Sequence, residues 1–269
     1  MPAAITHYYH ALRVLELWET EPYGGGTRRI FYWGAQGPDL LFYHRALPWQ
    51  KGESLSSFGE RLHQESVSRT VSILHEYGEA HPSECVWSCI AGFLCHYAAD
   101  RICHPFIEAQ ARELLKIQPD QDAQIAHHEM ESALDVVLLR YEAGALPIEF
   151  SLKKTLPKNQ KVQAEIVSLY AFLLHVRFGV SHALPLVEQA VKDARTAMGW
   201  LNDHTSLKKP LVERWEKKHG GKHTLSCHIR GVGEGMTSIM RTLYYRHGVH
   251  QRMEERTTRV FWMFMNVPL

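Results

Sequence analysis

The sequence lacks long apolar segments and a recognisable export signal. No run of about eighteen apolar residues, the length that a membrane-spanning helix requires, occurs in the chain. The N-terminal stretch from Met1 to Trp18 has neither a basic start nor an apolar region that ends at small residues. From these two absences we expect a cytoplasmic protein without a transmembrane segment.

An excess of either charge sign is also missing. The chain contains 30 Lys and Arg residues against 29 Asp and Glu residues, which gives a formal net charge of +1. Proteins that attract nucleic acids or anionic membranes through their overall electrostatic field carry a larger excess of positive over negative charges. Net charge therefore argues against a nucleic-acid partner, although a local basic patch stays compatible with one.

Cysteine is scarce, whereas histidine is abundant. The five cysteines are an odd number in a chain without an export signal, so we expect free thiols rather than a disulfide framework. Cys85 and Cys89 lie one helical turn apart, which would suit zinc, but no second pair follows at zinc-finger spacing. We favour buried core thiols for both. The 18 histidines, by contrast, invite a search for metal ligands.

Helical periodicity dominates the chain, and convincing strand alternation is absent. Apolar residues recur in steps of three and four, the pattern of amphipathic helices. The segments with this pattern are Ile5–Trp18, Phe58–Tyr77, Cys85–Cys103, Ile125–Tyr141, Val162–Phe178 and Leu186–Leu201. We therefore predict an all-α protein of about seven to ten helices. The polar stretch Ser151–Lys161 favours a metal-binding helical core in residues 1–145, with residues 146–269 packed on the same domain as C-terminal helices.

Two rows of polar side chains interrupt otherwise apolar helices. In "LCHYAADRICHPF", residues His96, Asp100 and His104 follow one another in steps of four, so they share one stripe of a helix that Pro105 is expected to end. In "HHEMESALD", His127, Glu131 and Asp135 repeat this spacing. Helix bundles build metal sites from such inward-facing rows on adjacent antiparallel helices, so the two rows predict a metal-binding cavity.

Three further candidate ligands lie upstream, namely His7, Asp39 and His63. Neutral imidazoles and carboxylates are the ligands that zinc takes in open, hydrolytic sites, and no cysteine is among them. Two further histidines, His223 and His228, lie in the stretch "KHTLSCHIRG". They either approach the same cavity or lie in a loop, and we leave them out of the predicted site.

Some assignments have alternatives. His44 also follows Asp39 closely and competes with His63, which we prefer because it lies in a long predicted helix. His128 competes with His127, which we prefer because it precedes Glu131 by four residues. For Asp135 we favour an outer position, where it holds a ligand imidazole, over direct metal binding.

The order of these residues, with the text "GPDLLFY", "GFLCHYAADRICHPF" and "HHEMESALD", resembles the zinc-dependent phospholipase C family. That family is related to the single-strand-specific nucleases and to glycosylphosphatidylinositol-specific phospholipase D. The resemblance covers roughly residues 1–145. It implies a multi-helix bundle of the phospholipase C and single-strand nuclease type.

The resemblance also implies which residues bind which ion. Asp39, His63, His96 and Asp100 would hold one zinc ion, whereas His104, His127 and Glu131 would hold a second. A third ion would take His7 and a bridging Asp100. Secreted members complete that third site with the amine and carbonyl of a mature N-terminal Trp, whereas this chain starts Met1-Pro2. We therefore expect two zinc ions, and the resemblance alone suggests a third.

The chemistry of such a site leads to a predicted function. Bound zinc lowers the pKa of a water molecule and neutralises charge that develops on a phosphoryl group. Asp39 would act either as a ligand or as the catalytic carboxylate that orients or deprotonates this water. We predict zinc-dependent, phospholipase C-like hydrolysis of a phosphoester substrate, which the resemblance extends to a phospholipid at a membrane surface. The alternatives are a nuclease or other phosphoesterase on the same scaffold, or a non-catalytic zinc-stabilised binding domain.

Overall fold

The computed structural model describes residues 4–17, 27–146, 148–203, 205, 207–219 and 225–231. Within these residues the chain forms nine α-helices, three 3₁₀ helices and one pair of two-residue strands, which confirms the predicted all-α class. The packing divides the chain into two units. Of the described residues, unit 1 contains 11–17, 27–98 and 151–200, and unit 2 contains 4–10, 99–146, 148–150 and those from 201 to 231.

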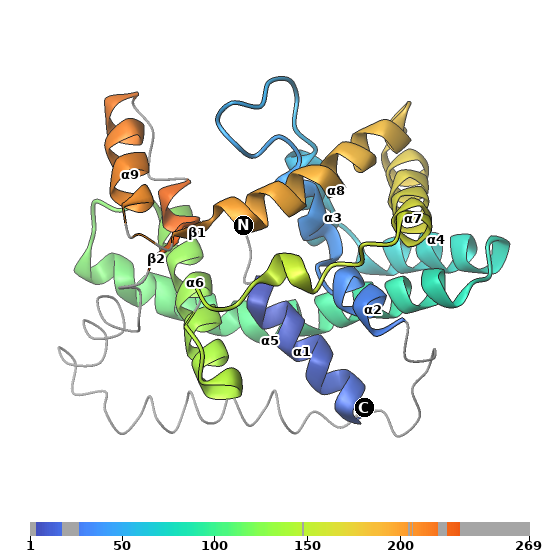
Figure 1. Ribbon diagram of the computed structural model, residues 1–269, viewed down its shortest axis with the longest axis horizontal. Coiled ribbons are helices and arrows are strands. Elements are labelled where there is room, and N and C mark those ends of the chain that lie inside the picture. Colours follow the sequence, from blue (N-terminus) through green and yellow to red (C-terminus); the bar gives the residue numbers. More distant parts are fainter. Residues whose placement is uncertain are drawn as a thin grey trace. The chain divides into compact units, whose positions relative to one another are not determined.

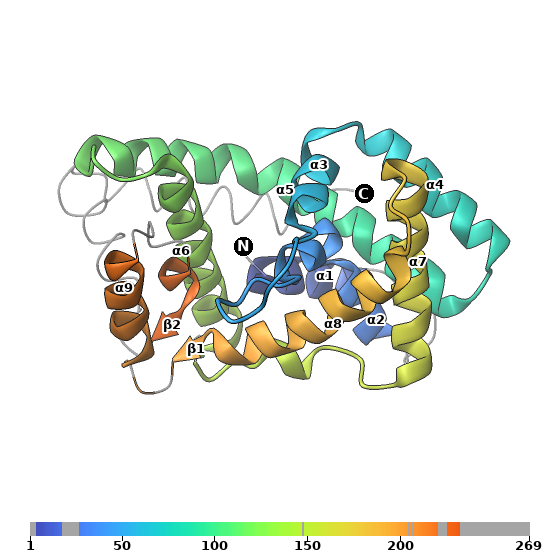
Figure 2. The same ribbon diagram turned by 90° about the horizontal axis from the view of Figure 1, so that it is seen from above.

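Unit 1 consists of helices that precede and follow the polar connection (Figure 1). Its elements are the later part of α1 (Ala4–Leu17), α2 (Arg28–Gly34), η1 (Gly37–Tyr43), α3 (Ser56–Gln64), α4 (Val67–Ala80), the first part of α5 (Glu84–Ile117), η2 (Leu152–Lys154), α7 (Gln160–Phe178) and α8 (Ala183–Trp200). Helix α7 packs beside both α4 and α8 (Figure 2). A core cluster of Phe31, Ala35 and Cys95 joins α2 to α5.

Unit 2 is built around the remainder of α5 and the helix that follows it. Its elements are the start of α1, the later part of α5, α6 (Ala123–Ala143), β1 (Asn202–Asp203), α9 (Lys208–Lys218), η3 (Ser226–His228) and β2 (Arg230–Gly231). Strands β1 and β2 pair in parallel. Helix α5 packs on α6 through buried residues that include Ile107, Leu114 and Met130. The sequence-based division at residue 145 stays a prediction about domains.

Two predicted helix boundaries were wrong. The segment Phe58–Tyr77 is two helices rather than one, because Glu65 adopts an extended conformation (φ −85°, ψ 173°) that closes α3 before α4 begins. Pro105 does not end its helix, because α5 continues to Ile117. Proline removes only one backbone donor, and the apolar residues beyond Pro105 that pack against α6 offset this loss.

All five cysteines are free thiols, as the sequence predicted, and all are buried, including Cys85 and Cys89, for which a core position was predicted. Burial raises the pKa of Cys85, Cys95 and Cys227 to about 12, so these thiols stay protonated at neutral pH. In the described part of the chain, no helix is long and apolar enough to cross a membrane.

Asp135 fixes the N-terminal turn of α1. Its carboxylate accepts hydrogen bonds from the backbone N–H groups of Ile5 (3.2 Å) and Thr6 (2.7 Å) and from the Thr6 hydroxyl (2.8 Å). These amides belong to the first turn of the helix, where no intrahelical acceptor exists. Asp135 on α6 therefore holds the helix that carries His7.

Replacement of Asp135 by alanine is expected to lower the free energy of unfolding by about 3 kcal/mol, because three buried donors lose their acceptor. The matched control is Asp122→Ala. Asp122 caps α6 through one hydrogen bond to the Gln124 N–H at 2.9 Å, and its loss should cost about 1 kcal/mol. Urea denaturation of both variants measures the difference, and equal losses would contradict the capping role of Asp135.

Candidate metal centre

Three predicted ligands come together in unit 1, and we call Asp39, His63 and His96 the first cluster. Each offers a ligand atom within 4.8 Å of the others. Asp39 lies in the first turn of η1, His63 near the end of α3, and His96 in the middle of α5. Asp39 and His96 are 1% and 0% exposed, whereas the His63 side chain is 20% exposed. The cluster is therefore closed on one side and reaches solvent at His63.

Backbone carbonyls orient both imidazoles of the first cluster. His96 Nδ1 lies 3.2 Å from the Ala35 carbonyl oxygen, and His63 Nδ1 lies 2.8 Å from that of Gly59. A carbonyl can only accept, so each Nδ1 carries a proton, and in the neutral ring Nε2 carries the lone pair. This outer support is typical of metal-binding histidines.

The two Nε2 atoms lie close to each other. His63 Nε2 lies 3.1 Å from His96 Nε2 and 3.2 Å from Asp39 Oδ1. Three electron-rich atoms at this separation repel one another unless a proton or cation is shared among them. Ligands of one tetrahedral zinc ion lie about 3.3 Å apart, given zinc–ligand distances of about 2.0–2.1 Å. The donor set of the first cluster therefore fits zinc.

Neighbouring side chains hold the helices of the first cluster in place. The Phe42 ring stacks on the His63 ring, with centroids 5.7 Å apart and an angle of 22°. Tyr97 of α5 donates a hydrogen bond of 2.9 Å to the Leu62 carbonyl of α3. Tyr170 of α7 likewise donates a hydrogen bond of 2.7 Å to the Gly37 carbonyl, beside Asp39. These contacts fix the relative position of η1, α3 and α5 within unit 1.

Gly37 is the position at which η1 approaches the His96 ring. Its φ is +52°, and an added Cβ would collide with the His96 side chain. We expect Gly37→Ala to lower the free energy of unfolding by about 2–4 kcal/mol, through left-handed strain and overpacking together. It should also weaken zinc binding, because the imidazole must move.

Gly144→Ala provides the matched control for this prediction. Gly144 has a φ of +61°, and nothing lies within 4 Å of an added Cβ, so this variant reports left-handed strain without a collision. Denaturation and zinc titration of the two variants measure both effects. If Gly37→Ala binds zinc as tightly as Gly144→Ala does, the close packing of Gly37 on His96 has no role in the site.

The second cluster, His104, His127 and Glu131, lies in unit 2. His127 Nε2 lies 3.1 Å from Glu131 Oε1, and the His104 and His127 rings meet edge to face with centroids 5.4 Å apart. Burial opposes ionisation of Glu131, but its hydrogen bonds with His127 and His128 outweigh this, so the pKa of Glu131 is lowered. The second cluster thus joins two imidazoles and one ionised carboxylate, a donor set that also suits zinc.

Two histidines near the second cluster were missing from the predicted site. His128 Nδ1 lies 3.1 Å from Glu131 Oε2, so Glu131 faces one histidine through each oxygen. His228 of η3 contacts His128 edge to face at 4.9 Å between centroids. In the sequence, the position of His128 directly after His127 already indicated it as an alternative ligand. The contact of His228 with α6 depends on the fold. His223 lies outside the described residues.

Asp100 connects His7 to the second cluster within unit 2. Asp100 Oδ1 lies 3.4 Å from His7 Nε2 and 3.5 Å from His104 Nε2. A place for Asp100 in the first zinc site, and a third ion at His7, both stay predictions. The alternative ligand His44 is fully buried, accepts a hydrogen bond from the Leu55 N–H at 3.2 Å, and belongs to none of the described clusters.

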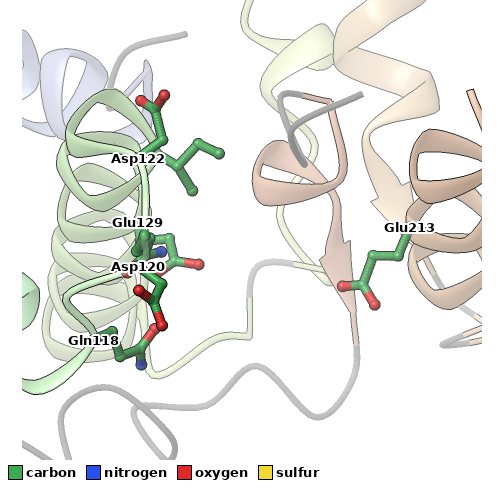
Figure 3. A pocket seen from close by; sticks show the side chains of 7 residues that line it. Gln118, Asp120, Asp122, Glu129 and Glu213 are labelled. Atoms are coloured by element: carbon green, nitrogen blue, oxygen red, sulfur yellow. The ribbon is translucent and has the colours of Figure 1, made fainter. Parts of the chain in front are cut away.

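A cavity of about 680 Å³ also lies in unit 2, but none of the eight predicted ligands lines it. Asp120, Asp122 and Glu129 lie on one side of it, on α6 and the turn before it, and Glu213 extends from α9 opposite (Figure 3). Four carboxylates would repel an anionic phosphodiester. This cavity is therefore a poor candidate for a phosphodiester-binding site.

Comparison with known proteins agrees with these donor sets. The family model described as Zinc dependent phospholipase C matches residues 5–183, which is more than half of the chain's 269 residues. The matched range contains every member of both clusters, as well as His7 and Asp100. No curated protein and no solved structure matches the chain. The chain therefore belongs to the zinc-dependent phospholipase C family.

Proposed function

We propose that the chain hydrolyses phosphodiester bonds with zinc at both clusters, in the manner of a phospholipase C. The observation that carries this proposal is the first cluster, where His63 Nε2, His96 Nε2 and Asp39 Oδ1 converge at 3.1 and 3.2 Å. A purely structural zinc site is normally closed by four protein ligands. The first cluster offers three candidate ligands, and the His63 side chain is 20% exposed, so a fourth position on the metal would be open to water and substrate.

The chain's own residues would contribute binding, orientation and proton transfer. Bound zinc would supply a water molecule of lowered pKa and a positive charge opposite the phosphoryl oxygens. His63 and His96 would bind the metal through Nε2 while the carbonyls of Gly59 and Ala35 keep their rings in place. Asp39 would act as a ligand or accept the proton of the attacking water. His104, His127 and Glu131 would hold the second ion.

Hydrolysis of a soluble chromogenic diester, bis(p-nitrophenyl) phosphate, by the purified zinc-loaded chain tests this proposal. We expect cleavage that a chelator abolishes and that added zinc restores. A panel that contains phosphatidylcholine and single-stranded DNA distinguishes a lipase from a nuclease. Retention of zinc without cleavage of any diester in the panel would favour a non-catalytic, zinc-stabilised domain and would refute the proposal.

A further inference from the structure

Helix α9 exposes an apolar stripe, formed by Leu207, Leu211 and Trp215. Leu207 precedes the helix as its N-cap residue, and the steps of four place all three side chains along one face. They are 65%, 61% and 48% exposed, respectively. A surface helix ordinarily turns its apolar face to the core, so three large apolar side chains in one exposed row are unusual.

The carboxylates of α9 lie on the opposite face of the helix, which packs on the rest of unit 2. Glu216 is 2% exposed, and it accepts hydrogen bonds from the Leu225 N–H at 2.7 Å and the Ser226 hydroxyl at 2.5 Å. Glu213 points to the acidic cavity of unit 2 (Figure 3). These contacts fix the rotation of α9, so the exposure of the apolar stripe follows from the buried position of Glu216.

Cations accompany the apolar stripe on the exposed face. Arg214 and Lys218 are exposed and follow Leu211 and Trp215 by three residues, so they flank the stripe, whereas Glu213, Glu216 and the exposed Lys217 lie toward other faces of the helix. The Trp215 ring stacks on His219, with centroids 4.7 Å apart and an angle of 30°. The exposed face of α9 therefore combines leucine, tryptophan and positive charge, without a carboxylate from the same helix.

We propose that this face of α9 docks on the surface of an anionic phospholipid bilayer. Helices that lie in a membrane interface present leucine and tryptophan to the acyl boundary and lysine or arginine to the head groups. Two leucines in the row argue against the phosphate backbone of a nucleic acid, which offers no apolar surface of this kind. The inference rests on the proposed function, since it would bring a phosphodiesterase to a lipid substrate. Helix α9 lies beyond the family match, so that match says nothing about this surface.

Co-sedimentation with vesicles of equimolar phosphatidylcholine and phosphatidylserine tests the proposal. We expect the full chain to bind these vesicles, and to bind phosphatidylcholine alone more weakly. The double variant Arg214→Gln and Lys218→Gln should bind the anionic vesicles about 25-fold more weakly, at roughly fivefold for each charge removed. Trp215→Ala should weaken binding about tenfold or more, because a large apolar side chain is no longer transferred from water into the bilayer.

Matched controls lie on unit 1. Trp49 is 57% exposed, and Lys153 and Lys154 are exposed on η2, so Trp49→Ala and Lys153→Gln with Lys154→Gln remove one tryptophan and two positive charges elsewhere. We expect these controls to bind vesicles like the unaltered chain. Circular dichroism of all variants verifies that they fold.

The proposal is overturned if the unaltered chain stays in the supernatant, or if the α9 variants bind like the controls. It is also overturned if sedimentation velocity shows a dimer that the α9 variants dissociate and no vesicle binding occurs, because a second copy would then cover the stripe. Cleavage of bis(p-nitrophenyl) phosphate without vesicle binding refutes the docking surface alone. Vesicle binding with the expected variant effects but no diester hydrolysis supports the surface and refutes the proposed function.

Discussion

Replacement of His96 by alanine is expected to abolish zinc binding at the first cluster and to lower phosphodiester hydrolysis about 1000-fold or more. Loss of an outer residue that orients a metal ligand typically costs about 10–100-fold, and His96 is proposed to be a ligand itself. Its Nε2 lies 3.1 Å from His63 Nε2, so its removal takes away one of three donors. Zinc content after dialysis and the hydrolysis rate measure the two effects.

Because His96 is completely buried, its truncation also leaves a cavity. Asp39→Asn serves as a second variant of the same shape, and it should lose most of the activity while the chain stays folded. His75→Ala is the matched control, since the His75 side chain is 66% exposed on α4. Unchanged zinc content and rate in both His96→Ala and Asp39→Asn would show that the first cluster is not the metal centre.

Removal of zinc by a chelator is expected to lower the melting temperature by about 10 °C. A ligand present at about 1000 times its dissociation constant stabilises the folded state by about 4 kcal/mol. In a chain of this size, each kcal/mol shifts the melting temperature by about 2–4 °C. The physical cause is the first cluster, where a carboxylate oxygen and two imidazole nitrogens lie close together in a buried position.

Thermal melts of the zinc-loaded and chelated chain, followed by circular dichroism, measure this shift. Added zinc should restore the higher melting temperature, whereas magnesium should not, because magnesium prefers oxygen ligands in octahedral geometry. In His96→Ala the shift should be smaller than in the unaltered chain, because only the zinc at the second cluster is retained. Identical melts with and without the chelator would contradict a metal that is coupled to folding.

The long helices could be predicted from the sequence because their apolar residues repeat regularly over many turns. Helices α5, α7 and α8 lie where the periodicity placed them, although α5 is longer than expected. Short elements escaped prediction, because seven residues of α2 or η1 hold too few repeats to show a period. The break at Glu65 depends on one residue in an extended conformation, which leaves no periodic signal.

Candidate ligands within one helix were predictable from spacing, whereas contacts between distant segments were not. His127 and Glu131 are four residues apart, so the sequence itself places them together. His228 reaches His128 through the packing of η3 against α6, and Glu216 binds the preceding residues Leu225 and Ser226 through hydrogen bonds. Likewise, the hydrogen bonds of Asp135 to the start of α1 span about 130 residues of sequence and depend on tertiary packing.

Anomalous scattering at the zinc edge, measured from crystals grown without a chelator, tests the metal centre most directly. We expect one zinc peak in contact with His63 Nε2, His96 Nε2 and Asp39, and a second in contact with His104, His127 and Glu131. A further peak beside His7 and Asp100 would add a third ion to this arrangement. Crystals of a folded, zinc-saturated chain with no peak at the first cluster would contradict the proposed metal centre.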